Sequence, residues 1–276
     1  MSLLYFTSFQ SEAAPAELNI ASLNMWSWGE KLEDRLDKMK PLFIEEKALE
    51  GVSALFLQEA IVQDKTNSVE MLARRLDWQN YFQKRRGDSE GLGIILPQTT
   101  QVLSQSKLDV KAKYNAADYN RIVVSLQIRD PQWGRVRLVN LHLAHEPFMA
   151  KTRKDQLQEI IDWTKGLEDK EASRYVIFGG DFNTGPQESF YERELDLLLA
   201  LPFLSSLAPV SGSNFSWTDF ESGEKELVDY FLLSQSPSWR TQLSTGTRID
   251  SRFTERRLSD HNLAKLRIVE DKEVAN

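Results

Sequence analysis

The chain has 276 residues, a formal net charge of −7 and no cysteine. Without cysteine there are no disulfides and no thiolate ligands, so any bound metal must be held by oxygen or histidine. The negative charge argues against a protein that coats nucleic acid through a broad basic surface, although it does not exclude a nuclease that binds its substrate briefly.

Length and patterning predict one domain, because a chain of this size can form one large core and no linker, repeat or low-complexity segment divides it. We expect an N-terminal extension over residues 1–17 and a single domain over residues 18–270. No apolar run approaches the roughly 20 residues that a membrane span needs, so we expect a soluble protein. We also expect a monomer. The sequence leaves its compartment open: the protein is either cytoplasmic or exported with a trimmed signal peptide.

The first elements along the chain are a strand, a helix and a strand. Residues 18–25 predict a strand, and residues 31–49 predict a helix because apolar residues recur every three or four positions. Pro41 either kinks this helix or starts a new one. The second strand is expected over residues 53–58, and it ends at Glu59.

The middle of the chain predicts a helix over residues 68–76 and then strands in series. These strands cover residues 91–97, 121–128 and 135–143. The turn residues at 130–134, Asp-Pro-Gln-Trp-Gly, predict that the last two strands form a hairpin.

The last part begins with a long helix over residues 151–167, which returns the chain to a strand that ends at Asp181. Thr184 and the following Gly-Pro-Gln offer the start of another helix. Further strands are expected near residues 215–218, 227–233, 242–247 and 263–268. Many strands with three or four amphipathic helices predict an α/β fold, in which two packed mixed sheets carry helices on both outer faces: a four-layer αββα sandwich.

Polar side chains stand at the ends of several apolar runs, as expected of buried strands that deliver polar groups to one common end of a sheet. The residues are Asn24, Glu59, His142, Asp181, Asn183, Asp229, Asp260 and His261.

Four of these residues are carboxylates, and burying them together is costly unless a cation or hydrogen bonds compensate. The cluster Glu59, Asp181, Asp229 and Asp260 therefore predicts a metal. Hard oxygen ligands favour Mg²⁺, with Mn²⁺ or Ca²⁺ as substitutes. Histidines beside such a site can donate protons or hydrogen bonds to a substrate oxyanion near neutral pH, which favours a phosphate ester as substrate.

Each residue also has a simpler interpretation. A single Asp or Asn at a strand end usually caps a turn or a helix. Capping alone hardly explains so many ordered strand-end residues of these types. The basic runs Lys84-Arg85-Arg86 and Arg252 with Arg256-Arg257 could steer an anionic substrate or be ordinary solvated surface.

Six short motifs follow one another along the chain. They are Ser-Leu-Asn at 22–24, Leu-Gln-Glu at 57–59, Val-Asn-Leu-His-Leu at 139–143, Gly-Asp-Phe-Asn at 180–183, Val-Asp-Tyr-Phe at 228–231 and Ser-Asp-His at 259–261. In this order they resemble the motifs of the endonuclease/exonuclease/phosphatase superfamily, which includes deoxyribonuclease I, exonuclease III-like repair nucleases, neutral sphingomyelinases and inositol polyphosphate 5-phosphatases. The resemblance covers roughly residues 18–268 and implies that superfamily's sandwich fold and metal-dependent phosphoester hydrolysis.

The resemblance implies a role for each motif residue. Glu59 would bind the metal, with Asn24 and Asp260 as direct or water-mediated ligands. Asp181 would position or deprotonate the attacking water, and Asn183 would hold a phosphoryl oxygen. The pair His261–Asp229 would stabilise the phosphorane-like transition state.

The deoxyribonuclease and sphingomyelinase branches suggest three more roles. His142 resembles the histidine that contacts phosphate or acts as an acid there, and Arg121 resembles their phosphate-facing arginine. Glu90 would orient His142.

The substrate is left open by conflicting features. Ala60 and Ile61 follow Glu59 where many nucleases of the family carry a basic residue that touches DNA, whereas residues 229–234 are close to those of repair nucleases. Residues 23–26, together with Arg35, look more like the sphingomyelinase-type phosphodiesterases. A nucleic acid and a lipid or small-molecule diester therefore rank level. The alternatives are a phosphomonoesterase of the inositol-phosphate type and a catalytically inactive binding module.

Overall fold

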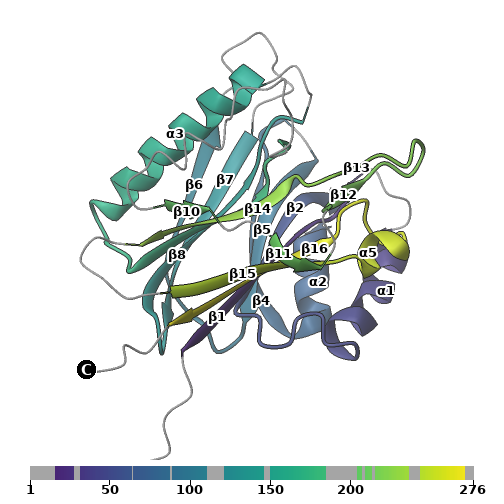
Figure 1. Ribbon diagram of the computed structural model, residues 1–276, viewed down its shortest axis with the longest axis horizontal. Helices are drawn as coiled ribbons and strands as arrows, with labels where there is room; N and C mark the ends of the chain where they lie inside the picture. Colours follow the sequence, from purple (N-terminus) through teal and green to yellow (C-terminus); the bar gives the residue numbers. More distant parts are fainter. Residues whose placement is uncertain are drawn as a thin grey trace, which may run out of the picture.

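Two β-sheets pack face to face at the centre of the structure (Figure 1). It is a computed structural model of the chain. It describes residues 16–27, 32–63, 65–87, 89–110, 121–145, 150–184, 204–206, 209–212, 215–235 and 243–270.

The larger sheet has eight described strands in the order β11-β15-β16-β1-β2-β5-β4, with β3 paired to β2. The pairs β1/β2 and β11/β15 are parallel and the other pairs are antiparallel, so the sheet is mixed. The strands are β1 (Glu17–Asn24), β2 (Ala54–Gln63), β3 (Thr66–Asn67), β4 (Trp78–Lys84), β5 (Glu90–Pro97), β11 (Pro209–Gly212), β15 (Leu243–Asp250) and β16 (Leu263–Glu270).

The smaller sheet has six described strands in the order β10-β14-β9-β8-β7-β6, of which only β8 and β9 pair in parallel. A short ribbon of two strands, β12 (Trp217–Thr218) and β13 (Lys225–Glu226), stands apart from both sheets. The strands of the smaller sheet are β6 (Gln101–Val110), β7 (Arg121–Asp130), β8 (Gly134–His142), β9 (Tyr175–Asp181), β10 (Leu204–Ser206) and β14 (Asp229–Gln235).

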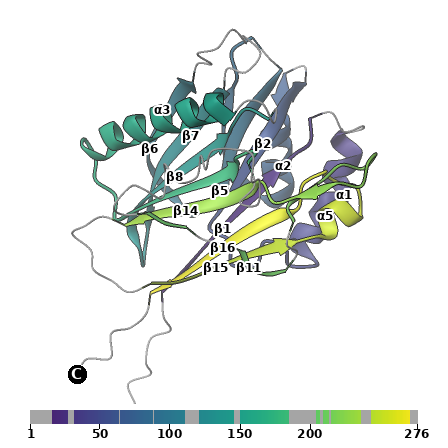
Figure 2. The same ribbon diagram turned by 45° about the horizontal axis from the view of Figure 1, so that its top comes forward.

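Helices cover the two outer faces and make four layers (Figures 1 and 2). The helices α1 (Leu32–Ile44), α2 (Ser68–Leu76) and α5 (Arg252–Glu255) lie on the side of the larger sheet, and α3 (Ala150–Glu168) lies over the smaller one. Three buried apolar clusters fill the three interfaces: one between the sheets, one under α1 and α2, and one under α3. The predicted four-layer sandwich is therefore confirmed.

Several elements match their predicted positions. Helix α2 spans the predicted residues, and the side chain of Asn67 caps it by accepting a hydrogen bond from the Glu70 backbone N–H. The hairpin of β7 and β8 forms as predicted, with Asp130 Oδ1 accepting from two backbone N–H groups of the turn. The helix expected after Thr184 lies outside the described residues.

Other elements differ from prediction. Helix α1 contains Pro41 and ends at Ile44, before the predicted end at Leu49. Strand β2 does not end at Glu59 but continues to Gln63, because a register shift relative to β5 accommodates Glu59 in a bulge. Strands β4 and β6 were not predicted.

Strand register brings three site residues side by side. In the parallel pair β8/β9, His142 is opposite Asp181, and in the antiparallel pair β9/β14, Asp229 is opposite Asp181. The end of β9 and the beginning of β14 therefore deliver carboxylates to the same end of the smaller sheet.

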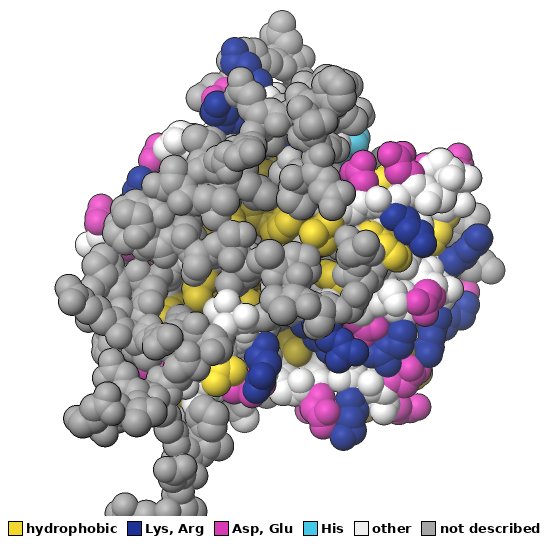
Figure 3. All heavy atoms as spheres, viewed as in Figure 1, with side chains coloured by type: hydrophobic (Ala, Val, Ile, Leu, Met, Phe, Trp, Pro, Cys, Tyr) yellow, Lys and Arg dark blue, Asp and Glu magenta, His cyan; other side chains and the backbone are white. Residues whose placement is uncertain are grey.

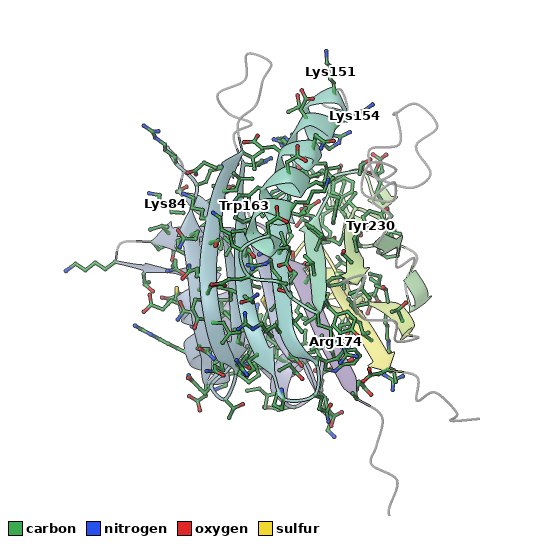
Figure 4. All side chains as sticks on the ribbon, turned by 90° about the vertical axis from the view of Figure 1, so that its left-hand side faces the viewer. Lys84, Lys151, Lys154, Trp163, Arg174 and Tyr230 are labelled. Atoms are coloured by element: carbon green, nitrogen blue, oxygen red, sulfur yellow. The ribbon has the colours of Figure 1, made fainter. Side chains whose placement is uncertain are left out.

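Two general observations concern the surface. On the face shown in Figure 3, positive and negative side chains of the described residues are interspersed rather than gathered into one field. Of the helices in the described ranges, none is both long and apolar enough to cross a membrane.

Candidate active site

The side-chain amide of Asn24, at the end of β1, connects the two sheets. Its Nδ2 atom donates to Glu59 Oε1 at 2.9 Å and to Asp181 Oδ2 at 3.1 Å, while its Oδ1 accepts from the Trp26 backbone N–H at 3.0 Å. Glu59 belongs to the larger sheet and Asp181 to the smaller one. The predicted site is thus shared between both sheets rather than built at the end of one.

Glu59 is aimed into the site by its bulge, where its backbone adopts a φ of 49°. Ser27 holds the other carboxylate oxygen, Oε2, through its backbone N–H at 2.9 Å and its hydroxyl at 2.8 Å. Burial acts to raise the pKa of Glu59, but hydrogen bonds from Asn24 and Ser27 and the charge of His261 bring it below its usual value. Glu59 is therefore ionised at neutral pH.

His261 lies between two buried carboxylates. Its Nδ1 atom is 2.8 Å from Asp229 Oδ2, and its Nε2 atom is 3.6 Å from Asp181 Oδ2. Burial acts to lower the pKa of His261, but the charges of Asp229 and Asp181 outweigh it and hold this pKa well above the ordinary value. The imidazole is therefore a cation at neutral pH.

For Asp181, the influences that raise the pKa outweigh those that lower it. Its burial, together with the charge of Asp229, raises the pKa of Asp181 to about 7, despite the nearby imidazolium of His261. The carboxylate accepts from the Asn183 backbone N–H at 2.9 Å, and Asn183 Nδ2 donates to the Leu143 carbonyl at 3.0 Å. An aspartate with a pKa near 7 can take up a proton during turnover.

His142 lies close to Asp181, and Arg121 lines the same pocket as His142. His142 Nε2 is 3.7 Å from Asp181 Oδ2. Burial, with the charge of Arg121 next in size, lowers the pKa of His142 well below the ordinary value, so this imidazole is neutral. It can donate or accept a hydrogen bond, but it holds no extra proton at neutral pH.

Asp260 approaches from the loop before β16. Its Oδ2 atom accepts from Trp217 Nε1 at 3.3 Å. Burial and the nearby charge of Glu59 raise the pKa of Asp260, although His261 opposes this. The preceding Ser259 hydroxyl donates to the Asn24 carbonyl at 2.6 Å and accepts from the His261 N–H at 3.0 Å, which joins this loop to the end of β1.

The described residues offer two groups of close ligand atoms, each within 4.8 Å of one another: Glu59 with His142 and Asp181, and Asp181 with Asp229 and His261. Carboxylates buried together favour a cation, and burial is the main cause that raises the pKa of both Asp181 and Asp260. Hard oxygen donors fit Mg²⁺ or Mn²⁺. Asp260 lies in neither group, so its assignment as a ligand stays a prediction.

Glu90 contacts Ser27 and Arg85. Its Oε1 lies 2.6 Å from Ser27 Oγ, so Glu90 and Glu59 share the single hydrogen of this hydroxyl, and its Oε2 is 3.4 Å from Arg85 Nη2. The chain of contacts thus runs from Arg85 through Glu90 and Ser27 to Glu59. The orientation of His142 by Glu90 stays a prediction.

Sequence patterns did not assign a role to Ser27 or Arg35. The buried guanidinium of Arg35 in α1 donates to the carbonyls of Met25, Trp26 and Leu258, at 2.8, 3.0 and 3.1 Å. It holds together the two loops that carry Ser27 and Asp260. The only signal in the sequence is an arginine on the apolar face of an amphipathic helix.

No protein-family model matches this sequence, and no curated protein matches it significantly. Solved structures do match. A functionally unknown conserved protein from Enterococcus faecalis is 18% identical, with 92% of this chain and 100% of that chain covered and a TM-score of 0.72. An endonuclease/exonuclease/phosphatase from Bacteroides vulgatus is 17% identical, with 93% and 100% covered and a TM-score of 0.71.

TDP2 from D. rerio, in complex with a single-strand DNA product, is 17% identical, with 93% of this chain and 100% of that chain covered and a TM-score of 0.68. These similarities show that the chain has the fold of the endonuclease/exonuclease/phosphatase structures. The resemblance found in the sequence motifs is confirmed at the level of the fold.

Proposed function

We propose that this protein, which shares the endonuclease/exonuclease/phosphatase fold, is a divalent-metal-dependent phosphodiesterase that uses water as its nucleophile. One observation carries the proposal: Asn24 joins Glu59 and Asp181 from opposite sheets, within reach of an imidazolium held by Asp229. Such a cluster combines a cation site, a base near pH 7 and a positively charged donor.

Glu59 would hold the metal, with Asn24 and Asp260 beside it. Mg²⁺, with Mn²⁺ or Ca²⁺ as substitutes, would polarise the phosphoryl group and neutralise charge on its oxygens. Asp181, a buried carboxylate 3.6 Å from His261 Nε2, would accept the proton of the attacking water as the new bond from oxygen to phosphorus forms. The bond from phosphorus to the leaving oxygen breaks, that oxygen takes up a proton from solvent water, and Asp181 returns its proton to solvent.

The remaining residues bind the phosphoryl oxygens. His261, held as a cation by Asp229, donates to an oxygen on which charge accumulates in the transition state. Asn183 uses one amide hydrogen on the Leu143 carbonyl and can present the second to the substrate. His142 would also contact this phosphoryl group, and Arg121, which lines the same pocket as His142, would face a substrate phosphate.

A nucleic acid and a lipid or small-molecule diester are both compatible with this chemistry. The complex of D. rerio TDP2 with a single-strand DNA product supports the nucleic-acid substrate. The alternatives remain an inositol-phosphate monoester and, for an inactive protein, a bound partner.

The test is incubation with Mg²⁺ or Mn²⁺ and, separately, plasmid DNA, RNA, sphingomyelin and bis-(p-nitrophenyl) phosphate. His261→Ala serves as the control for contaminating activity. We expect metal-dependent hydrolysis of at least one diester by the wild type and none by the variant. Equal activity of the two proteins, or no hydrolysis of any diester, would overturn the proposal.

A further inference from the structure

An open pocket lies beside the proposed catalytic cluster, on the side of His142. It is open to solvent, and its walls carry two arginines, Arg85 and Arg121, and two acids, Glu59 and Glu90. Arg121 is the first residue of β7, and Arg85 directly follows β4. The mechanism proposed above gives Arg85 no role.

Arg121 has an unmet hydrogen-bonding group in this pocket. Arg121 is only 7% exposed, and its Nε atom is buried without a hydrogen-bond partner among the described residues. Buried donors are almost always paired, and an unpaired one on a charged group is especially costly. The Nε atom of Arg121 can therefore donate to an acceptor that a ligand brings into the pocket.

The groups around the pocket also favour an anion. Arg121 Nη2 lies 3.4 Å from His145 Nδ1, and the guanidinium groups of Arg121 and Arg85 are the cations in the pocket wall. Of the two acids, Glu90 contacts Arg85, and Glu59 would be occupied by the metal. The scissile phosphodiester carries one negative charge, so this set of cations suits more than one phosphate.

On the basis of the proposed function, we propose that Arg85 and Arg121 bind a second phosphate of the substrate, next to the phosphodiester that is cleaved. The substrate class that fits is a nucleic-acid strand, which carries a phosphate at every nucleotide. Guanidinium groups bind phosphate oxygens through paired N–H donors. A phosphocholine lipid would instead place a quaternary ammonium cation beside two arginines. Arg85 thus determines specificity for a neighbouring phosphate.

The experiment compares two substrates that differ by one phosphate: thymidine 5′-(p-nitrophenyl phosphate) and the same diester with an added 3′-phosphate. For the wild type we expect kcat/KM to be at least about ten-fold higher with the added phosphate, the scale of one hydrogen bond to a charged group. Arg85→Gln should abolish most of this preference and Arg85→Lys should retain part of it. Arg86→Gln, which changes an exposed neighbour, should keep the full preference.

A second measurement separates failure of the subsite from failure of the proposed catalysis. Calorimetry with thymidine 3′,5′-bisphosphate and thymidine 5′-monophosphate reports binding without turnover, and the bisphosphate should bind more tightly to the wild type but not to Arg85→Gln. If neither diester is cleaved but this difference appears, the subsite stands and the hydrolase proposal fails. Equal kcat/KM for the two diesters, a preference unchanged in Arg85→Gln, or equal binding of the two nucleotides would overturn the subsite.

Discussion

His261 Nδ1 lies 2.8 Å from Asp229 Oδ2, and both side chains are buried. The second oxygen of Asp229, Oδ1, has no hydrogen-bond partner among the described residues, so this carboxylate directs its hydrogen bonding to the imidazole. The backbone N–H groups of Val228 and Asp229 both donate to the Ser216 hydroxyl, which fixes the start of β14. The charge of Asp229 therefore governs the protonation of His261.

Asp229→Asn should lower both the rate and the upper pH limit of activity. The carboxylate raises the pKa of His261, so its removal lowers that pKa, and the active imidazolium loses its proton at a lower pH. We expect kcat to fall by about 100-fold or more. The measurement is the pH–rate profile on bis-(p-nitrophenyl) phosphate, with the exposed Asp162→Asn as control. An alkaline limb at the wild-type pH would contradict this role.

Glu59→Gln should abolish stabilisation by metal. An ion that binds only the folded protein raises its melting temperature, and Glu59 is the proposed ligand that Ser27 and Asn24 hold in place. A thermal melt with and without Mg²⁺ measures the effect, with Glu255→Gln on α5 as a matched control. If Glu59→Gln shows the same shift as the wild type, the metal binds elsewhere.

Arg35→Met should destabilise the fold and slow catalysis, although Arg35 does not belong to the catalytic cluster. The change leaves the carbonyls of Met25, Trp26 and Leu258 without their buried donor, which we expect to cost about 2–4 kcal/mol in the free energy of unfolding. Urea titration gives this energy, and kcat measured well below the unfolding midpoint gives the effect on the site. Lys38→Met, on the exposed side of α1, should change neither quantity.

Gly180→Ala should be strongly destabilising because Gly180, just before Asp181, has a φ of 134° and a Cβ there would lie 2.0 Å from the Leu141 carbonyl oxygen. We expect a loss of about 3 kcal/mol or more, with displacement of Asp181 and loss of activity. Gly166→Ala is the matched control, since nothing lies within 4 Å of its Cβ and it sits in α3. That change should stabilise the protein by about 0.5–1 kcal/mol. Equal melting temperatures for the two variants would refute the expectation.

The sequence predicted the buried strands better than the edge strands. Strand β9 is buried on both faces, and its continuous run of apolar residues was enough to predict a strand. Strands β4 and β6 lie at the edges of their sheets, and their polar residues, as in Gln79 and Asn80 of β4, break the apolar pattern. Edge strands that face solvent need no apolar run, which is why they were missed.

The residues of the candidate site also divide into those that the sequence could predict and those that it could not. Residues at the ends of apolar runs, such as Asn24, Asp181 and Asp229, could be predicted because strand ends meet at sheet edges. The bulge at Glu59 could not, because the polar pair Gln58 and Glu59 interrupts the apolar run as a strand end would, although the strand continues to Gln63. The contact of Arg35 with Leu258 depends on a loop 223 residues further along the chain, and local sequence holds no information about such an approach.

The bulge in β2 also places Glu59 next to the hydrogen bonds that join the two sheets. Beside the bulge, the carbonyls of Leu57 and Gly93 in the larger sheet both accept from Nδ2 of Asn140 in the smaller sheet, at 3.0 and 2.8 Å. Gln58, which precedes Glu59, donates to Asn140 Oδ1 at 2.7 Å. A chain with both sheets formed but not yet docked would lack these bonds, as well as the link between Asn24 and Asp181. Metal affinity would then report on the docking of the two sheets rather than on the formation of their strands. During refolding, the protein would acquire metal affinity only in the step in which the core between the sheets forms.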